Sequence, residues 1–139
     1  MNNRILLSIL VIGAIVLIPV FGITFFSPDA QMSKIYERNR LICEDYQVDH
    51  LKHERGEISD QTFIENEKFR LEQEQKLLNE TKNLPDSLQL QRLKSMLTYR
   101  IQGSEILISS YYENKNRSKE VTAIWTKSKR EADLYLQES

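Results

Sequence analysis

The sequence predicts an all-α protein in which a single N-terminal transmembrane helix precedes an antiparallel bundle of three to four helices. Three observations predict this class. An uncharged apolar run fills residues 5–26, apolar side chains recur at helical spacing through residues 27–139, and strand-like alternation is missing. The 113 residues after the run are enough for one hydrophobic core and too few for two.

A short tail, residues 1–4, precedes the apolar run from Ile5 to Phe26. A helix of these 22 residues would be about 33 Å long, sufficient to cross a hydrocarbon core of roughly 30 Å. The run exceeds the apolar core of about 7–15 residues found in cleaved signal peptides. We therefore expect an uncleaved anchor that makes the chain a single-pass protein of the cell membrane, with cleavage as the alternative.

The charges around the apolar run leave its orientation nearly balanced. Arg4 lies before the run, whereas Lys34, Arg38 and Arg40 lie within about 15 residues after it. A short positive tail before an N-terminal apolar run is typical of a signal-anchor, which keeps the N-terminus inside. This feature favours an extracytoplasmic domain, and the opposite orientation is the alternative.

The first helix of the domain is expected over residues 28–55. Ser27 can cap this helix, Pro28 suits its first position, and Asp29 meets the positive helix end. Because this start directly follows residue 26, we expect the membrane helix to lead into the first helix of the domain without a flexible linker. Gly56 can adopt the left-handed conformation that ends a helix.

The second helix is expected over residues 60–83, with Ser59 as its cap. Its apolar positions are sparse, and Ile64, Leu71 and Leu78 lie seven residues apart in a narrow seam. Such a seam is typical of a helical hairpin or a coiled coil. These three residues are therefore candidate interaction residues.

The third and fourth helices are expected over residues 86–113 and 119–137, with Ser118 as the cap of the fourth. The third carries the cleanest apolar stripe in the domain. Gly103 lies within it and costs about 1 kcal/mol relative to alanine, so we expect it to permit close helix contact. Aromatic side chains on these helices are further candidate interaction residues, as core or interface anchors. They are Tyr111, Tyr112 and Trp125.

A turn pattern between the first two helices resembles a known family. It combines a leucine-containing helix end, a Gly-x-Ile-Ser turn and a following phenylalanine, carried by Leu51, Gly56, Ile58, Ser59 and Phe63. With it, residues 49–72 resemble the SHOCT (short C-terminal) helical hairpin, although Gln61-Thr62 replaces an acidic residue and the hairpin lies mid-chain. The resemblance implies a helix-turn-helix packing unit, sometimes linked to self-association and without enzyme activity. Capping and turn chemistry alone would select the same residues.

The charge of the chain is nearly balanced but unevenly distributed. The whole chain has 19 Lys and Arg against 20 Asp and Glu, which argues against a nucleic-acid-binding protein because such a protein needs a dominant basic face. Acids dominate residues 44–80, whereas bases dominate residues 81–139. Two helices of opposite sign packing side by side would explain this pattern. The alternative is a basic segment, residues 115–130, that faces anionic lipid or an acidic partner.

One cluster has side chains that metal sites use. His50, His53 and Glu54 lie at the end of the first helix, and Cys43 lies seven residues before His50 on the same face. Polar residues are also favourable at a helix C-terminus without any metal, and no second ligand pair occurs elsewhere. We therefore expect no metal site, and these four residues are the candidates if one exists.

Catalytic motifs are missing from the sequence, which has no glycine-rich phosphate loop, Gly-x-Ser-x-Gly elbow or Cys-x-x-Cys pair. We therefore expect no catalytic residue, no cofactor and no enzyme activity. The anchor, its linker-free junction and the thin apolar seams favour a non-enzymatic accessory or assembly subunit of a larger membrane complex. Its partners would be the lipid bilayer and other membrane subunits, or a second copy of the chain. The alternatives are a membrane-anchored sensor or ligand-binding domain, which requires a defined pocket, and a spanin-like tether.

Overall fold

A computed structural model describes residues 27–138 of the chain. The expected tail and membrane anchor, residues 1–26, lie outside the described residues. Among residues 27–138, no helix combines the length and apolar character needed to cross a bilayer. The bundle described below belongs to a compact unit that begins at Ile35.

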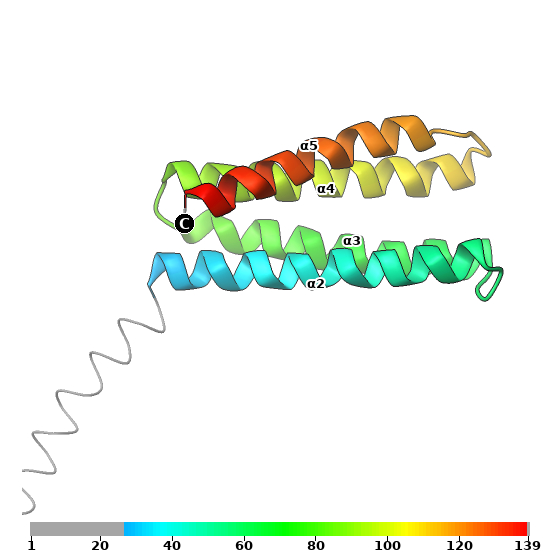
Figure 1. Ribbon diagram of the computed structural model, residues 1–139, viewed down its shortest axis with the longest axis horizontal. Coiled ribbons are helices and arrows are strands. Elements are labelled where there is room, and N and C mark those ends of the chain that lie inside the picture. The colour runs from blue at the N-terminus through cyan, green and yellow to red at the C-terminus, as the bar shows by residue number, and fades with distance from the viewer. Residues whose placement is uncertain (1–26, 139) are drawn as a thin grey trace, which may run out of the picture. The chain divides into compact units, whose positions relative to one another are not determined.

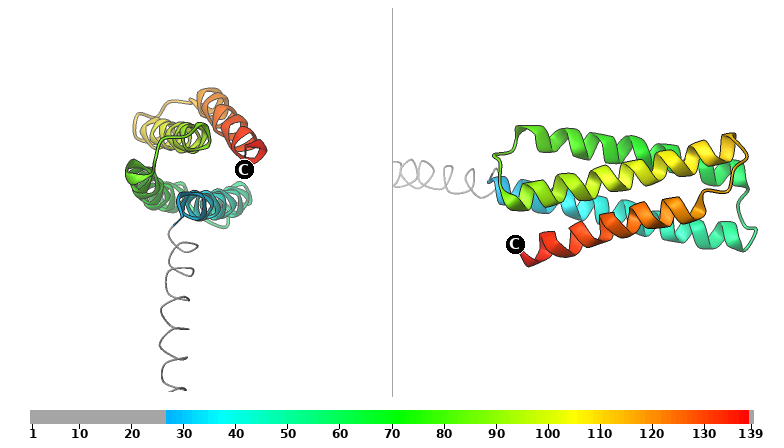
Figure 2. Two further views of the ribbon diagram at one scale, coloured as in Figure 1. Left: turned by 90° about the vertical axis from the view of Figure 1, so that its left-hand side faces the viewer. Right: turned by 90° about the horizontal axis from the view of Figure 1, so that it is seen from above.

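Residues 27–138 form four α-helices, one short 3-10 helix and no strand. In chain order they are α2 (Pro28–Glu54), α3 (Asp60–Glu80), η1 (Thr81–Asn83), α4 (Leu88–Tyr112) and α5 (Ser118–Gln137). The chain reverses direction between successive helices (Figure 1), and the end-on view in Figure 2 places them around a common centre. The prediction of an all-α helical bundle is confirmed for this part of the chain.

Three serine caps set the starts of α2, α3 and α4. Ser27, Ser59 and Ser87 each accept a hydrogen bond from the backbone N–H three residues further on, at 3.2, 3.1 and 3.0 Å. Each bond satisfies one of the N–H groups that lack a partner in the first turn. Gly56 has φ +70°, the left-handed conformation expected after α2.

Several helix ends differ from the prediction. The third helix begins at Leu88, after Ser87, and not at residue 86. Two other differences have a clear local cause. Ser118 is the first residue of α5 and does not cap it; the Oδ1 atom of Asn116 instead accepts hydrogen bonds from the Ser118 N–H at 3.1 Å and its hydroxyl at 2.8 Å. The expected end of the second helix tightens into the 3-10 turn η1, where the Thr81 hydroxyl donates to the Leu78 carbonyl at 2.6 Å. Both differences reflect local side-chain bonds that compete with the regular helix ladder.

The apolar core follows α4, which packs against both α3 and α5. The buried apolar residues of α4 are Leu90, Leu93, Met96, Leu97 and Ile101. The predicted close helix contact at Gly103 is confirmed, because the Trp125 indole of α5 lies directly against this glycine. The absence of a Cβ atom at Gly103 thus lets α4 and α5 approach each other.

The inward face of α3 explains why its apolar positions are sparse. Of the predicted seam, Ile64 is buried, whereas Leu71 and Leu78 are only half-buried. The buried positions between Ile64 and Leu77 are charged. The residues of α3 that face the core therefore follow the 3.6-residue repeat of a helix and not the seven-residue repeat of a coiled coil. Charged residues that form ion pairs occupy the middle of this face.

Candidate functional site

Five charged side chains are buried inside the bundle: three from α3, one from α4 and Asp49 from α2. Glu67 and Glu74 are fully buried, and Arg70 and Arg100 expose only 2% and 5% of their surface. Charges are almost never fully buried unless they are paired, because leaving water costs several kcal/mol per ion. The pairing of these groups therefore decides whether the core is stable.

Arg100 joins α4 to α3 by binding both buried carboxylates. Its Nε atom lies 2.6 Å from Oε1 of Glu74, and its Nη2 atom lies 3.4 Å from Oε1 of Glu67. The hydroxyl of Ser104 lies 3.5 Å from the other Glu74 oxygen. Acidic residues of α3, from the acidic part of the sequence, thus pair with a basic residue of α4, from the basic part. This is the side-by-side packing of oppositely charged helices that one of the two sequence interpretations expected.

Arg70 extends the same network from α3 to α2. Its Nε atom lies 2.8 Å from Glu67, and its Nη1 atom lies 2.8 Å from both Asp45 and Asp49. Asn66 also donates to Asp49 at 2.7 Å. We call Glu67, Arg70, Glu74 and Arg100, with the α2 acids Asp45 and Asp49, the buried ion network. It connects three helices through charge-assisted hydrogen bonds.

The pKa values of two carboxyl groups in the buried ion network are shifted in opposite directions. Burial raises the pKa of Glu74 to about 7, and attraction to Arg100 only partly offsets this effect. Burial also acts on Asp49, but hydrogen bonds from Arg70 and Asn66 outweigh it and hold the pKa of that carboxyl below its ordinary value. Glu74 is consequently the member of the network that can gain or lose a proton near neutral pH.

The raised pKa of Glu74 predicts that stability falls as pH increases from 5 to 8. A folded-state pKa above the ordinary value of 4.5 means that the folded protein holds the proton more tightly than the unfolded chain. That contribution is complete below about pH 4.5 and is lost as pH rises through about 7. Urea unfolding followed by circular dichroism should show a declining midpoint in this range. The lowered pKa of Asp49 acts in the opposite direction, but only at more acidic pH.

Two substitutions separate Glu74 from other carboxylates in this pH test. Glu74→Gln removes the titrating group, so the slope between pH 5 and 8 should flatten. Glu80→Gln is the matched control, because Glu80 forms only an exposed pair with Arg38. Equal slopes in the parent protein and in Glu74→Gln would show that another group titrates.

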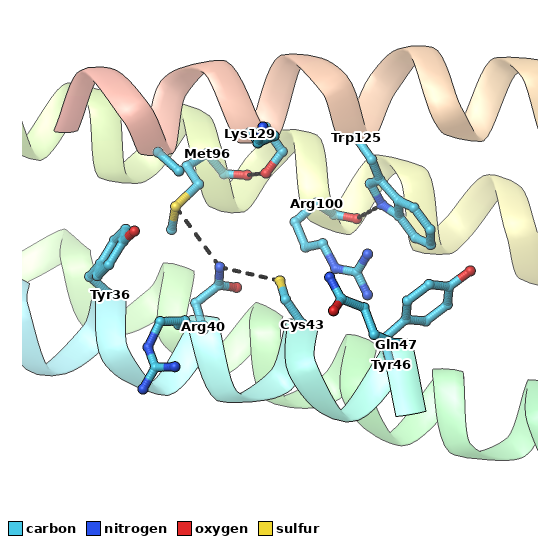
Figure 3. A pocket seen from close by; sticks show the side chains of 12 residues that line it. Tyr36, Arg40, Cys43, Tyr46, Gln47, Met96, Arg100, Trp125 and Lys129 are labelled. Carbon is cyan, nitrogen blue, oxygen red and sulfur yellow. Dashed lines mark hydrogen bonds between the residues drawn. The ribbon is translucent and has the colours of Figure 1, made fainter. Parts of the chain in front are cut away.

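A pocket opens beside the buried ion network, between α2, α4 and α5 (Figure 3). Its volume is about 360 Å³. The Arg100 guanidinium projects into it and lies 4.0 Å from the Trp125 ring and 4.9 Å from the Tyr46 ring. The Trp125 Nε1–H donates to the Arg100 carbonyl at 3.1 Å, so the indole is held at both its face and its edge. Arg100 thus belongs to both the network and the pocket.

The wall formed by α2 adds an amide and a thiol to the pocket. Asn39 is buried, and its Nδ2 atom lies 3.8 Å from the Cys43 sulfur and 3.9 Å from the Met96 sulfur. Its Oδ1 atom is buried without a hydrogen-bond partner among the described residues. Burial raises the pKa of the Cys43 thiol, which keeps it in the less reactive protonated form.

The structure separates the four candidate metal-ligating residues. Cys43 lines the pocket, whereas His50 pairs with Glu54 at 3.4 Å and His53 contacts Asp60 at 2.6 Å across the α2–α3 turn. Within residues 27–138, no three His, Cys, Asp or Glu side chains are close enough to hold a metal ion together. In this structure, therefore, His50 contacts a residue at the end of α2, and His53 contacts a residue across the following turn.

The aromatic candidates divide between the pocket and the surface. Trp125 is part of the pocket, as described above. Tyr111 and Tyr112 lie exposed at the end of α4, with ring centroids 5.2 Å apart, and the Tyr112 hydroxyl accepts a hydrogen bond from Lys68 at 2.7 Å. They form no common site with Trp125.

Sequence reasoning did not identify the buried ion network. The signal was present in α3, where charged residues occupy positions 67, 70 and 74 of the face that Phe63, Ile64 and Leu77 define as apolar. Arg100 similarly interrupts the apolar stripe of α4, three residues after Leu97. Charges at core positions of two helices, opposite in sign, indicate a buried pairing.

Comparisons with known proteins identify no relative: no family model, curated protein or solved structure matches the chain. The helix-turn-helix expected over residues 49–72 is present as the α2–α3 connection, and the SHOCT resemblance stays a prediction.

Proposed function

We propose that this chain is a non-enzymatic, single-pass membrane protein whose helical bundle binds a small organic ligand between α2, α4 and α5, as a sensor or ligand-binding domain. The observation that carries the proposal is the pocket. Its volume of about 360 Å³ lies within the range of small-molecule sites. Three aromatic residues with Cys43, Met96 and Ala132 make up half of its lining, and polar or charged residues make up the other half. Apolar walls combined with convergent polar groups are usual for such sites.

The position of Arg100 supports a sensing role. Its side chain contacts the Glu74 carboxylate of α3, the Tyr46 ring of α2 and the Trp125 ring of α5. A ligand that shifts this guanidinium would change contacts with all three neighbouring helices. Differential binding to two such arrangements is what a ligand-driven change in helix packing requires.

The membrane part of the proposal rests on the apolar run at residues 5–26, which is long enough to span a bilayer. The short positive tail before it favours an extracytoplasmic position for the bundle. A ligand-binding domain in that position would meet molecules outside the cytoplasm.

A neutral apolar probe tests whether the pocket accepts a ligand. We expect 1-octanol to change the emission of Trp125 saturably and to slow alkylation of Cys43 by N-ethylmaleimide, in the full chain held in phosphatidylcholine nanodiscs. Both reporters are unambiguous, because the chain contains one Trp and one Cys and both line the pocket.

A filled-pocket variant provides the control for this experiment. Ala132→Phe should abolish both responses because Ala132 lines the pocket, whereas Ala123→Phe, at an exposed position of the same helix, should preserve them. Responses that persist unchanged in Ala132→Phe would place the probe elsewhere and count against the proposed function.

An accessory or assembly subunit is the second candidate, favoured by an apolar surface on α2 and α3. Leu41 and Phe69 are 55% and 63% exposed and line a groove between these helices. Such a surface fits a helix of another subunit or of a second copy. A particle mass that stays monomeric in mild detergent, without a co-purifying protein, would argue against this candidate. The chain reversals after α2, α3 and α4 disfavour the extended tether.

A further inference from the structure

The charged side chains that line the pocket all have the same sign. They are Arg40, Arg100 and Lys129, and no Asp or Glu lines the pocket. Arg40 is paired with the α2 acids Glu37 and Glu44. Lys129 forms no ion pair or hydrogen bond with any side chain in the described part of the chain. The pocket therefore presents an uncompensated cation at its rim.

The Arg100 guanidinium has one nitrogen atom, Nη1, left to bind a ligand in the pocket. Arg100 uses Nε and Nη2 to bind the buried carboxylates, whereas Nη1 makes no hydrogen bond within residues 27–138. Trp125 and Tyr46 hold the plane of the guanidinium, so the direction of this remaining donor is set before a ligand arrives. Guanidinium donors of this kind bind carboxylate oxygens well.

A second buried polar group at the pocket lacks a partner. The Oδ1 atom of Asn39 is buried without a hydrogen bond among the described residues, although the residue is only 4% exposed. An unmade hydrogen bond at a buried acceptor destabilises the empty pocket. An ionised acidic group has no proton to donate to this oxygen, so in an anionic occupant that group is expected at the Arg100 donor and not at Asn39.

On the proposed ligand-binding function, we infer that the pocket takes an organic anion with an apolar body, such as a medium-chain carboxylate. Its acidic group lies towards Arg100, with Lys129 adding positive potential at the rim. Its apolar body lies against Met96, Trp125 and the other hydrophobic side chains of the walls.

The charge on Glu74 controls how strongly Arg100 attracts this anion. The groups that face Glu74 are the Arg100 guanidinium and the Ser104 hydroxyl of α4, the Glu67 carboxylate of α3 and the Cys43 thiol of α2. Glu74 is the partner closest to Arg100, so neutralising it leaves more of the guanidinium charge for the occupant. Glu74→Gln should therefore strengthen anion binding relative to the binding of a neutral molecule by the same variant.

Octanoate and 1-octanol test the inference as a matched pair, because they share an eight-carbon body and differ in charge. We expect octanoate to bind about tenfold more tightly, as measured by Trp125 emission and Cys43 protection in the full chain in phosphatidylcholine nanodiscs. Equal affinities would overturn the anion inference and leave the pocket function standing. Failure of both probes would count against the pocket itself.

Substitutions on α5 and α3 assign the selectivity to this pocket. Lys129→Met should weaken octanoate binding about two- to fivefold relative to 1-octanol binding by the same variant. Lys127→Met removes the same charge from α5 at a position outside the pocket and should have no effect. Glu74→Gln should tighten octanoate binding. If Lys129→Met and Lys127→Met act equally, the preference reflects overall charge and the inference fails.

Nanodiscs of different composition identify the source of the anion. Protection of Cys43 by octanoate in pure phosphatidylcholine assigns the site to a free carboxylate. Protection by added phosphatidylglycerol, without octanoate and lost in Ala132→Phe, assigns it to an anionic lipid. Protection by neither anion overturns the inference.

Discussion

Replacing Gly103 by alanine is expected to destabilise the bundle by about 1–3 kcal/mol, the usual cost of inserting an extra methyl group into a well-packed core. A Cβ atom at this position would lie 2.9 Å from Cε2 of Trp125 and still closer to Nε1 and Cδ1. The indole cannot move aside freely, because it donates to the Arg100 carbonyl and stacks on the Arg100 guanidinium. The overlap therefore outweighs the gain of about 1 kcal/mol that alanine brings to a helix interior.

Urea unfolding of Gly103→Ala in the presence and absence of Trp125 tests this cause. In a Trp125→Ala background the overlap disappears, so Gly103→Ala should be neutral or stabilising, and the double-mutant cycle should show a large coupling. Gly56→Ala is the control, because its cost comes from φ +70° and no atom lies within 4 Å of the added carbon. That cost should be the same with and without Trp125. A Gly103→Ala penalty that also survives removal of Trp125 would contradict the explanation.

Local signals in the sequence predicted most of the helical architecture. Ser27 and Ser59 accept the expected capping bonds that begin their helices, and Gly56 adopts the left-handed conformation after α2. These features depend on a few neighbouring residues, so they can be recognised without knowledge of the fold. Even Gly103, a costly residue in mid-helix, indicated a close contact with another helix.

The candidate site could not be predicted in the same way, because it depends on contacts between distant segments. Asp49, Arg70 and Arg100 come from three helices, and a charged residue in a helix ordinarily indicates a solvated face. The thin apolar seam of α3 therefore predicts a surface for a partner. In the structure, Glu67 and Glu74 lie on the buried side of the same helix. Similarly, the pocket exists because α2 and α5 lie across from each other, which no local pattern encodes.

The position of the pocket beside the buried ion network gives the network a role other than stability. Well-packed apolar residues often stabilise a core as well as buried ion pairs do, so stability alone does not explain five buried charges. Here the network holds Arg100 in one direction and sets how much of its charge faces the pocket. Functional sites are where such departures from an apolar core are expected.

Removing the central cation of the buried ion network should have the largest effect of any single substitution in the bundle. Arg100→Met leaves Glu74 without its ion-pair partner and leaves Glu67 with Arg70 alone. Breaking a buried pair in this way costs about 3–5 kcal/mol, because Glu74 must then either stay charged without a partner or take up a proton. Loss of helical circular dichroism in urea should therefore occur at a much lower concentration than in the parent protein.

Two further variants establish that this loss comes from the unpaired carboxylate. Arg100→Met combined with Glu74→Gln should recover part of the stability, because the buried negative charge is removed together with its partner. Arg100→Met alone should also become more stable at acidic pH, where Glu74 takes up a proton. Arg38→Met is the matched control: it breaks the Arg38–Glu80 pair, whose side chains are 44% and 45% exposed, and should cost no more than about 1 kcal/mol. If Arg100→Met costs no more than Arg38→Met, the buried ion network does not hold the core together, and Arg100 loses the fixed position on which its role at the pocket depends.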